Sequence, residues 1–179
     1  MPVPSTVTVI EGHDQAIRAA TAAIGAAVGD APDRAVLAMV GEQLRALAAR
    51  ALPWDMLRLP AGALSAVHLL GLGDRDRVAL YAVADAPGTR SIPHVHHTWS
   101  VTIGVEGVEA NTFFAHDGAR CLARLGSQQV GPGDVAIMTE AEAHATEVVS
   151  AAPMLHLHVY GRPIHVLAPF ATRVLAPLA

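Results

Sequence analysis

The chain has 179 residues, 52% of them hydrophobic, and a formal net charge of −4. This length suits one domain with a substantial core. The 12 Lys and Arg residues are scattered, which argues against a nucleic-acid partner, because phosphate binding needs a concentrated basic face. No apolar run approaches the roughly 20 residues that a spanning helix needs, and the single cysteine, Cys121, excludes an internal disulfide. The N-terminus lacks the pattern of a signal peptide, so we predict a cytoplasmic protein without a membrane partner.

The first third of the chain is predicted to be helical. Residues 13–28 are rich in alanine, and residues 32–52 place apolar side chains at helical spacing. Asp30 or Asp33 can begin the second helix. We therefore expect a pair of amphipathic helices that pack on a larger body.

From about residue 63 the apolar pattern changes to a period of two, which is typical of strands. Turn signals such as APGTR, HDGA and GPGD separate the segments. The predicted strands are 64–70, 77–84, 94–106, 108–115, 120–125, 135–139, 144–149 and 154–160. Short strands at this spacing predict a mainly β sandwich or barrel. We expect a single domain, residues 1–179, with a helical part (1–55), a β-barrel (63–165) and a C-terminal tail (166–179).

Histidines are concentrated in the predicted β part, where nine of the ten lie between His68 and His165. The segment PHVHHTW, residues 93–99, holds three of them. Alternation along a strand places His94 and His96 on one face and His97 on the other. Two imidazoles so placed can bind one ion, although His-x-His alone is a weak signal.

The segment around these histidines resembles the first conserved motif of the cupin superfamily, with Gly88, His94, His96 and Gly107 in register. Ser100 occupies the position of the motif's glutamate. The segment GDVAIMTEAEAH resembles the second motif through Gly133 and His144. The resemblance implies a cupin double-stranded β-helix, that is, a jelly-roll barrel.

Within that superfamily the chain is similar to the cysteine dioxygenase-like thiol dioxygenases and their bacterial relatives. The similarity lies in HVHHTW, in the Asn-Thr-aromatic stretch NTFF, and in HLHVYG near the C-terminus. In HLHVYG, His158 and Tyr160 match the family pattern, and His156 replaces a serine. The resemblance implies that His158 and Tyr160 form a hydrogen-bonded relay beside the metal.

Spacing and resemblance together predict His94, His96 and His144 as metal ligands. Three neutral imidazoles leave a divalent ion with its full charge of +2, which favours an anionic ligand, and leave coordination positions open. The resemblance implies Fe(II), while zinc, nickel and manganese stay open as alternatives, because zinc accepts the same ligands.

The predicted function is therefore that of a non-haem Fe(II)-dependent dioxygenase, an enzyme that acts on a small anionic substrate, a thiol or related acid, with O₂. The alternatives are a zinc- or nickel-dependent hydrolase, isomerase or lyase, and a non-enzymatic cupin that binds a small molecule.

Substrate binding is the least defined part of the prediction. The family's carboxylate-binding arginine corresponds to His68 here, and a single imidazole cannot form the bidentate contact of a guanidinium. Candidate substrate-binding residues are His68, His156, Arg162 and Ser100, with Arg173 in the same C-terminal region as Arg162. The apolar C-terminal stretch is expected to cover the sheet of its own barrel or of a neighbour, so a homodimer is also predicted.

Overall fold

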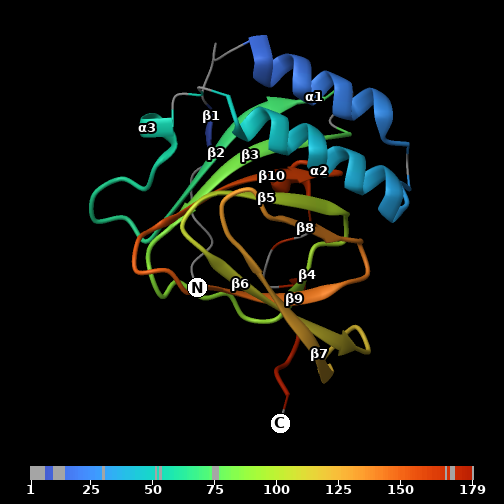
Figure 1. The fold of residues 1–179 in the computed structure, drawn as a ribbon. Coiled ribbons are helices and arrows are strands. Elements are labelled where there is room, and N and C mark those ends of the chain that lie inside the picture. Colours follow the sequence, from blue (N-terminus) through green and yellow to red (C-terminus); the bar gives the residue numbers. More distant parts are fainter. Residues whose placement is uncertain are drawn as a thin grey trace.

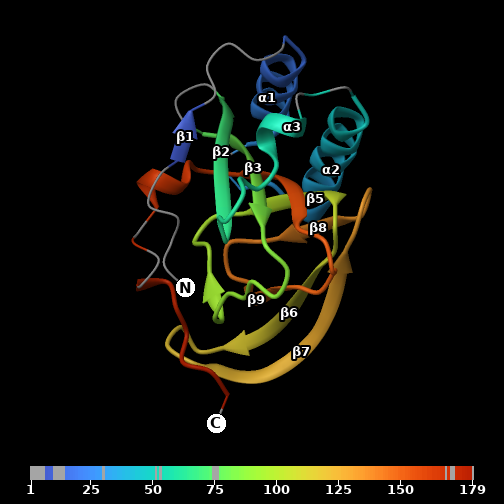
Figure 2. The ribbon, with the colours of Figure 1, turned by 90° about the vertical axis from the view of Figure 1, so that its left-hand side faces the viewer.

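The computed structural model describes residues 7–9, 15–29, 31–50, 52, 54–73, 77–167, 169 and 172–178. Two β-sheets face each other, and helices lie on the outer side of the larger one (Figures 1 and 2). The elements are β1 (Val7–Val9), α1 (Gln15–Ala27), α2 (Arg34–Ala48), α3 (Trp54–Leu57), β2 (Ser65–Leu72), β3 (Ala79–Asp85), β4 (His94–Val95), β5 (Ser100–Glu106), β6 (Glu109–His116), β7 (Cys121–Val130), β8 (Val135–Met138), β9 (Ala143–Val148), β10 (Met154–Tyr160) and the 3₁₀ turn η2 (Ile164–Val166).

The strand pairing has the nested pattern of a jelly roll. The hairpin β6–β7 is innermost, and β5–β8, β4–β9 and β3–β10 pair outward from it, all antiparallel. The resulting orders are β1-β2-β3-β10-β5-β8 in one sheet and β4-β9-β6-β7 in the other. Rolling one long hairpin in this way closes a barrel with its interior between the two sheets. The predicted mainly β jelly roll with an N-terminal pair of helices is confirmed.

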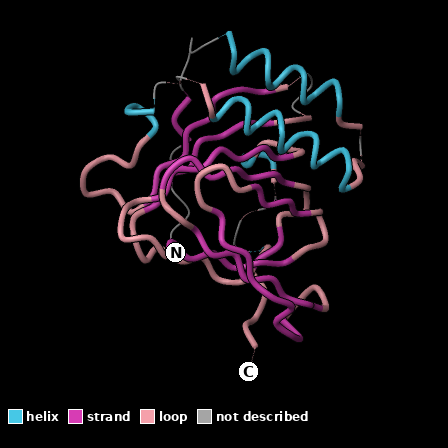
Figure 3. Tube along the Cα trace, viewed as in Figure 1, coloured by secondary structure: helices cyan, strands magenta, loops and turns pink. Residues whose placement is uncertain are grey.

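The helices cover the outer face of the six-stranded sheet (Figures 1 and 3). Asp33 caps α2 by accepting a hydrogen bond from the Val36 amide at 2.8 Å, as its position in the sequence predicts. Leu37 and Leu44 of α2 are fully buried. At Gly41 an added Cβ would lie 2.8 Å from a methyl group of Val135 on β8, so the absence of a side chain lets the helix approach the sheet closely. Of the predicted first helix, residues 13 and 14 lie outside the described residues.

The predicted continuous strand 94–106 is wrong. It divides into β4 and β5, because His97 between them adopts a left-handed backbone with φ of 55°. This residue breaks the ladder, yet it still leaves His94 and His96 buried and His97 exposed. The sequence also gave no indication of β1, which pairs in parallel with β2.

The C-terminal tail covers its own small sheet. Leu175 is 1% exposed and packs with Val95, Cys121 and Ala143. Val174 and Ala176 form β-bridges to β4 and to the start of β7. Residues 168, 170, 171 and 179 of the predicted tail lie outside the described residues. None of the described helices is long and apolar enough to cross a membrane.

Glycines with left-handed backbone lie in the turns between β3 and β4, between β5 and β6, and between β7 and β8. Gly88, Gly107 and Gly133, the glycines of both cupin-like motifs, have φ of 76°, 68° and 84°. This region of backbone space is unfavourable for residues with a Cβ. At Gly107 an added Cβ would also lie 2.6 Å from the carbonyl oxygen of Pro153, so both conformation and space require glycine there.

Replacing Gly107 by alanine should lower the free energy of unfolding by about 2–5 kcal/mol, because left-handed strain and backbone overlap add. Chemical denaturation measures the change. Gly118→Ala is the matched control, since Gly118 has φ of 93° but no atom within 4 Å of an added Cβ. Equal losses in the two variants would contradict a steric role for the approach of Pro153.

Candidate metal centre

Three buried histidines from distant parts of the chain converge in the barrel. His94 lies on β4, His96 follows it, and His144 lies on β9. The β4–β9 pairing places His94 directly opposite His144. One ligand nitrogen from each ring lies within 4.8 Å of the others, and in the described part of the chain this is the group of metal-binding side chains that meets that limit. The structure thus brings together the three predicted ligands.

The ring geometry is close-packed. Ring centroids are 5.1 Å apart for His94 and His96, 4.6 Å for His94 and His144, and 4.9 Å for His96 and His144. The Nε2 atoms of His96 and His144 are 3.1 Å apart. At this separation both atoms would be able to bind one ion at metal–nitrogen distances of about 2.1 Å.

Hydrogen bonds orient the rings of His94 and His144 so that Nε2 carries the lone pair. The Nδ1 of His94 lies 2.9 Å from the carbonyl oxygen of Ile92, which can only accept, so Nδ1 carries the proton. The Nδ1 of His144 lies 2.7 Å from Oδ1 of Asn111, whose amide nitrogen in turn donates to Glu109 at 2.9 Å. Asn111 therefore fixes the ring of His144 in the tautomer that a metal requires.

Ser100 contacts the third ring, that of His96. Its hydroxyl lies 3.2 Å from Nδ1 of His96. A hydroxyl can rotate to donate or to accept a hydrogen bond, so this contact is compatible with both tautomers of the ring. Ser100 was predicted to bind substrate, but it does not line the cavity beside the histidines.

The three rings fit a divalent cation in charge as well as in position. Burial lowers the pKa of His94 to about 4, with the positive charge of Arg173 adding to the effect. Burial lowers the pKa values of His96 and His144 well below the usual 6.5 as well. All three are neutral near pH 7, which is the form that binds a metal. A cation compensates three lone pairs that otherwise converge on one point.

The histidines open into a cavity of about 240 Å³ between the two sheets. His158 and Tyr160 of β10 line it, as predicted, and the rings of Tyr160 and His96 are 5.3 Å apart. The Nδ1 of His158 lies 3.1 Å from the Thr102 hydroxyl and 3.4 Å from the Tyr160 hydroxyl. Burial raises the pKa of Tyr160 far above 10, so its hydroxyl keeps its proton.

The structure does not bring His68 or Arg162 to the cavity. Ser65 and Val67 of β2 line it, so alternation turns His68 to the other face of the strand. Arg162 is exposed and outside the lining. His156 faces the barrel interior from β10 but is fully buried behind the lining.

Arg173 is a buried arginine whose charge acts on the histidines, although it does not line the cavity. It is 8% exposed, and its charge lowers the pKa values of His94, His96 and Tyr160. Its own carbonyl accepts from the Val95 amide at 3.0 Å, which anchors it beside β4. The sequence indicated only that an arginine of the C-terminal region could bind substrate. It could not place Arg173, because the β-bridge between the next residue, Val174, and His94 follows no local pattern.

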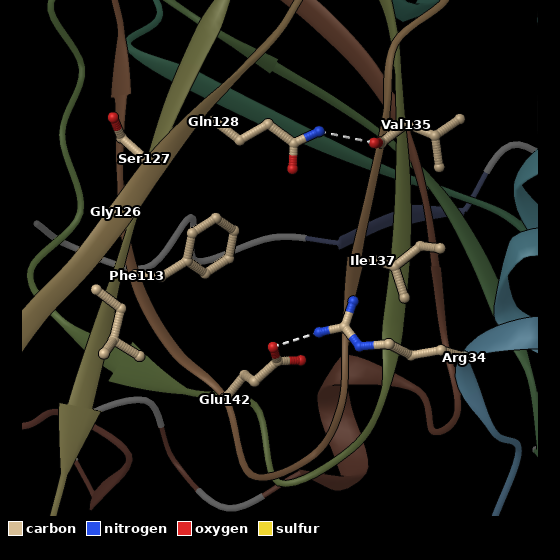
Figure 4. A pocket seen from close by; sticks show the side chains of 9 residues that line it. Arg34, Phe113, Gly126, Ser127, Gln128, Val135, Ile137 and Glu142 are labelled. Carbon is tan, nitrogen blue, oxygen red and sulfur yellow. Dashed lines mark hydrogen bonds and ion pairs between the residues drawn. The ribbon is translucent and has the colours of Figure 1, made fainter.

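A second cavity of about 480 Å³ lies between β7 and β8 (Figure 4). Its charged groups, Arg34 and Glu142, form an ion pair at 2.5 Å, and Gln128 donates to the Val135 carbonyl at 2.9 Å. These polar side chains are therefore already paired with groups of the protein. The histidine-lined cavity is the better candidate for a functional site.

No family model matches the chain, and no curated protein matches it. Similar solved structures include oxalate decarboxylase from Bacillus subtilis, 26% identical, with 49% of this chain and 22% of that chain covered and a TM-score of 0.41. A cupin superfamily protein from Desulfitobacterium hafniense is 17% identical, with 63% and 90% covered and a TM-score of 0.47. KdgF from Halomonas sp. is 11% identical, with 59% and 86% covered and a TM-score of 0.45. The chain spans less than a quarter of the oxalate decarboxylase, and the jelly-roll assignment rests on the strand order.

Replacing Asn111 by alanine should weaken metal binding about 10–100-fold, because His144 loses the acceptor that fixes its tautomer. Titration of the metal-free protein with Co²⁺, followed by visible absorption, measures the affinity. Gln129→Ala, on the exposed part of β7, should leave the affinity unchanged. Unaltered Co²⁺ affinity in the Asn111 variant would contradict this role.

The pH dependence of stability provides a second test. Burial lowers the pKa of His156 from 6.5 to about 4. Between pH 6.5 and 4, the His156 ring therefore binds a proton in the unfolded chain but not in the folded chain. His156 therefore makes the folded state less stable as pH falls through that window, by about 1 kcal/mol per pH unit. Glu109 acts in the opposite direction, because burial raises its pKa to about 7.

Urea denaturation of metal-free protein at pH 7 and pH 5 should show a smaller loss of stability in His156→Leu than in the parent chain. His97→Asn is the control, since His97 is exposed and asparagine tolerates its left-handed backbone. An identical loss in parent and His156→Leu would show that the pKa of His156 is the same in the folded and the unfolded chain, which would contradict its lowering by burial.

Proposed function

We propose that this protein is a metal-dependent enzyme whose centre is formed by His94, His96 and His144, and that it acts on a small anionic substrate as an Fe(II)-dependent dioxygenase. The observation that carries the proposal is the convergence of three neutral, buried imidazoles at the wall of a cavity between the two sheets. Iron, when bound, would supply the redox chemistry with dioxygen that side chains lack. Three protein ligands on one face would leave room for both substrate and O₂.

An anionic substrate is supported by the charges near the histidines. Arg173 keeps its positive charge even when buried, because guanidinium is not deprotonated in proteins. With three neutral ligands and no carboxylate among them, this end of the cavity attracts a negative group. We propose that Arg173, which lies outside the lining of the cavity, favours the anion through its charge and not by direct contact, in place of His68 or Arg162.

Tyr160 and His158 are proposed to position the substrate. Tyr160 holds its proton and so acts as a donor, and the Nδ1 of His158 accepts from it or from Thr102. When an anionic group enters the cavity, the Tyr160 hydroxyl can turn to it while Thr102 keeps its contact with His158. The pair thus orders the substrate and holds a proton beside it.

The proposal is tested by loading the protein with Fe²⁺ under anaerobic conditions, then adding O₂ and measuring its consumption. Uptake should require both the protein and a small anionic substrate, such as a thiol or a 1,3-diketone in its enolate form. It should fall to background in His144→Ala and persist in His97→Asn. If the loaded protein consumes no oxygen with any of these anions, the dioxygenase proposal fails. Substrate turnover by the zinc form alone would instead favour a hydrolase, isomerase or lyase.

A further inference from the structure

Exposed apolar side chains form the opening of the histidine-lined cavity. Leu64, just before β2, and Ile92, two residues before His94, line the cavity and are 70% and 46% exposed. Ile164 of η2 lines it as well and is half-buried. Side chains that line a cavity and also face solvent mark its opening, and we call Leu64, Ile92 and Ile164 the apolar mouth. Their convergence from three segments on one opening indicates that an apolar group passes there.

The apolar mouth is held by contacts within the fold. The carbonyl oxygen of Ile92 lies 2.9 Å from Nδ1 of His94, so the mouth adjoins the metal centre on this side. The amide of Ile164 donates to the Tyr81 hydroxyl at 2.9 Å, which fixes η2 against β3. The opening is therefore formed before any ligand arrives.

An apolar wall leads from the mouth to the histidines. Val67 of β2 lies opposite Val83 of β3, and both line the cavity. These two residues, Ile164 and Tyr160 pack against one cluster of buried side chains. The ring of Tyr160 in turn lies 5.3 Å from the ring of His96. The wall is thus continuous from the opening to the metal centre. Strands β8 and β10 add three more apolar lining residues, Ala136, Met138 and Met154.

The polar side chains of the lining are mostly paired within the protein. Such pairs are Ser65 with Asp85, Ser91 with Thr146, and Asn111 with Glu109. Within the described residues, Oδ1 of Asp85 and Nε2 of His158 have no partner, but both atoms are buried and offer no surface to a ligand. The apolar side chains are therefore the larger part of the wall that a ligand can contact.

The charges of the lining exclude a second anionic group. None of the described residues that line the cavity is a lysine or an arginine, and the acids among them are Asp85 and Glu109. A carboxylate away from the histidines would find no counter-ion in the lining and would lose its hydration. A ligand that fits the whole cavity is therefore anionic at one end only.

We propose that the ligand of this cavity is a small amphiphile, with one anionic group at the histidines and an apolar chain that lies along Val67 and Val83 and leaves through the apolar mouth. The anionic half of this statement rests on the proposed function, and the apolar half does not. Each methylene that the chain buries against this wall should strengthen binding about two- to fourfold. Length of the chain then contributes to affinity and selects the substrate.

Calorimetric titration of the Zn²⁺-loaded protein with butanoate, hexanoate and octanoate tests the proposal, since zinc accepts the same three histidines. Affinity should rise about two- to fourfold for each added methylene. Leu64→Ser should lower the affinity for octanoate about threefold or more, and that for butanoate by less, because only the longer chain reaches the mouth. Leu125→Ser is the matched control, since Leu125 is 69% exposed and lies outside this cavity.

Butanedioate should bind at least about tenfold more weakly than butanoate, because its second carboxylate stays inside the cavity. Equal binding of these two acids would contradict the absence of a counter-ion. An affinity that does not change with chain length would overturn the proposal, and so would a rise that persists unaltered in Leu64→Ser. Thermal unfolding verifies that this variant folds.

A second series, from butanol to octanol on the metal-free protein, separates the two halves of the proposal. If the metal centre is wrong, these alcohols should still bind more tightly as the chain lengthens. Absence of binding by both series would overturn the apolar half as well. Neither titration uses iron or oxygen, so the result is independent of the oxygen-uptake experiment.

Discussion

The pairing of β4 with β9 is the contact on which the site depends. It is only two residues long, yet it places His94 opposite His144, fifty residues later in the chain. The pairing exists because the β-region is rolled as one nested hairpin, in which β6 pairs with the other edge of β9 from Glu109–Val148 to Phe114–Ala143 and fixes its register. The backbone bridge of Val174 holds β4 from its other edge. The short strand β4 is thus positioned by its neighbours, and they fix the positions of His94 and His144.

Burial then determines the chemistry of these histidines. Desolvation keeps their rings neutral at a pH where exposed histidine begins to be protonated, and neighbouring acceptors set which nitrogen carries the proton. The hydrogen bonds from Asn111 to Glu109 and between Asn111 and His144 extend this network of acceptors behind the rings. Without a cation, the convergence of these lone pairs would destabilise the fold, so binding a metal and stabilising the barrel are linked.

The sequence by itself determined the strand periodicity, the two helices and the identity of the three histidines, because alternation, caps and motif spacing are local properties of the chain. It also determined where glycine must lie, since the left-handed turns at Gly88, Gly107 and Gly133 admit no side chain at low cost. Only the tertiary structure decided the face of His68, which depends on the exact register of β2, and the break at His97, where a left-handed residue ends a ladder that the pattern continued. The position of Arg173 was likewise set by contacts between segments far apart in the chain. No local pattern encodes such contacts, because their energy arises only when the barrel closes and removes the groups from water.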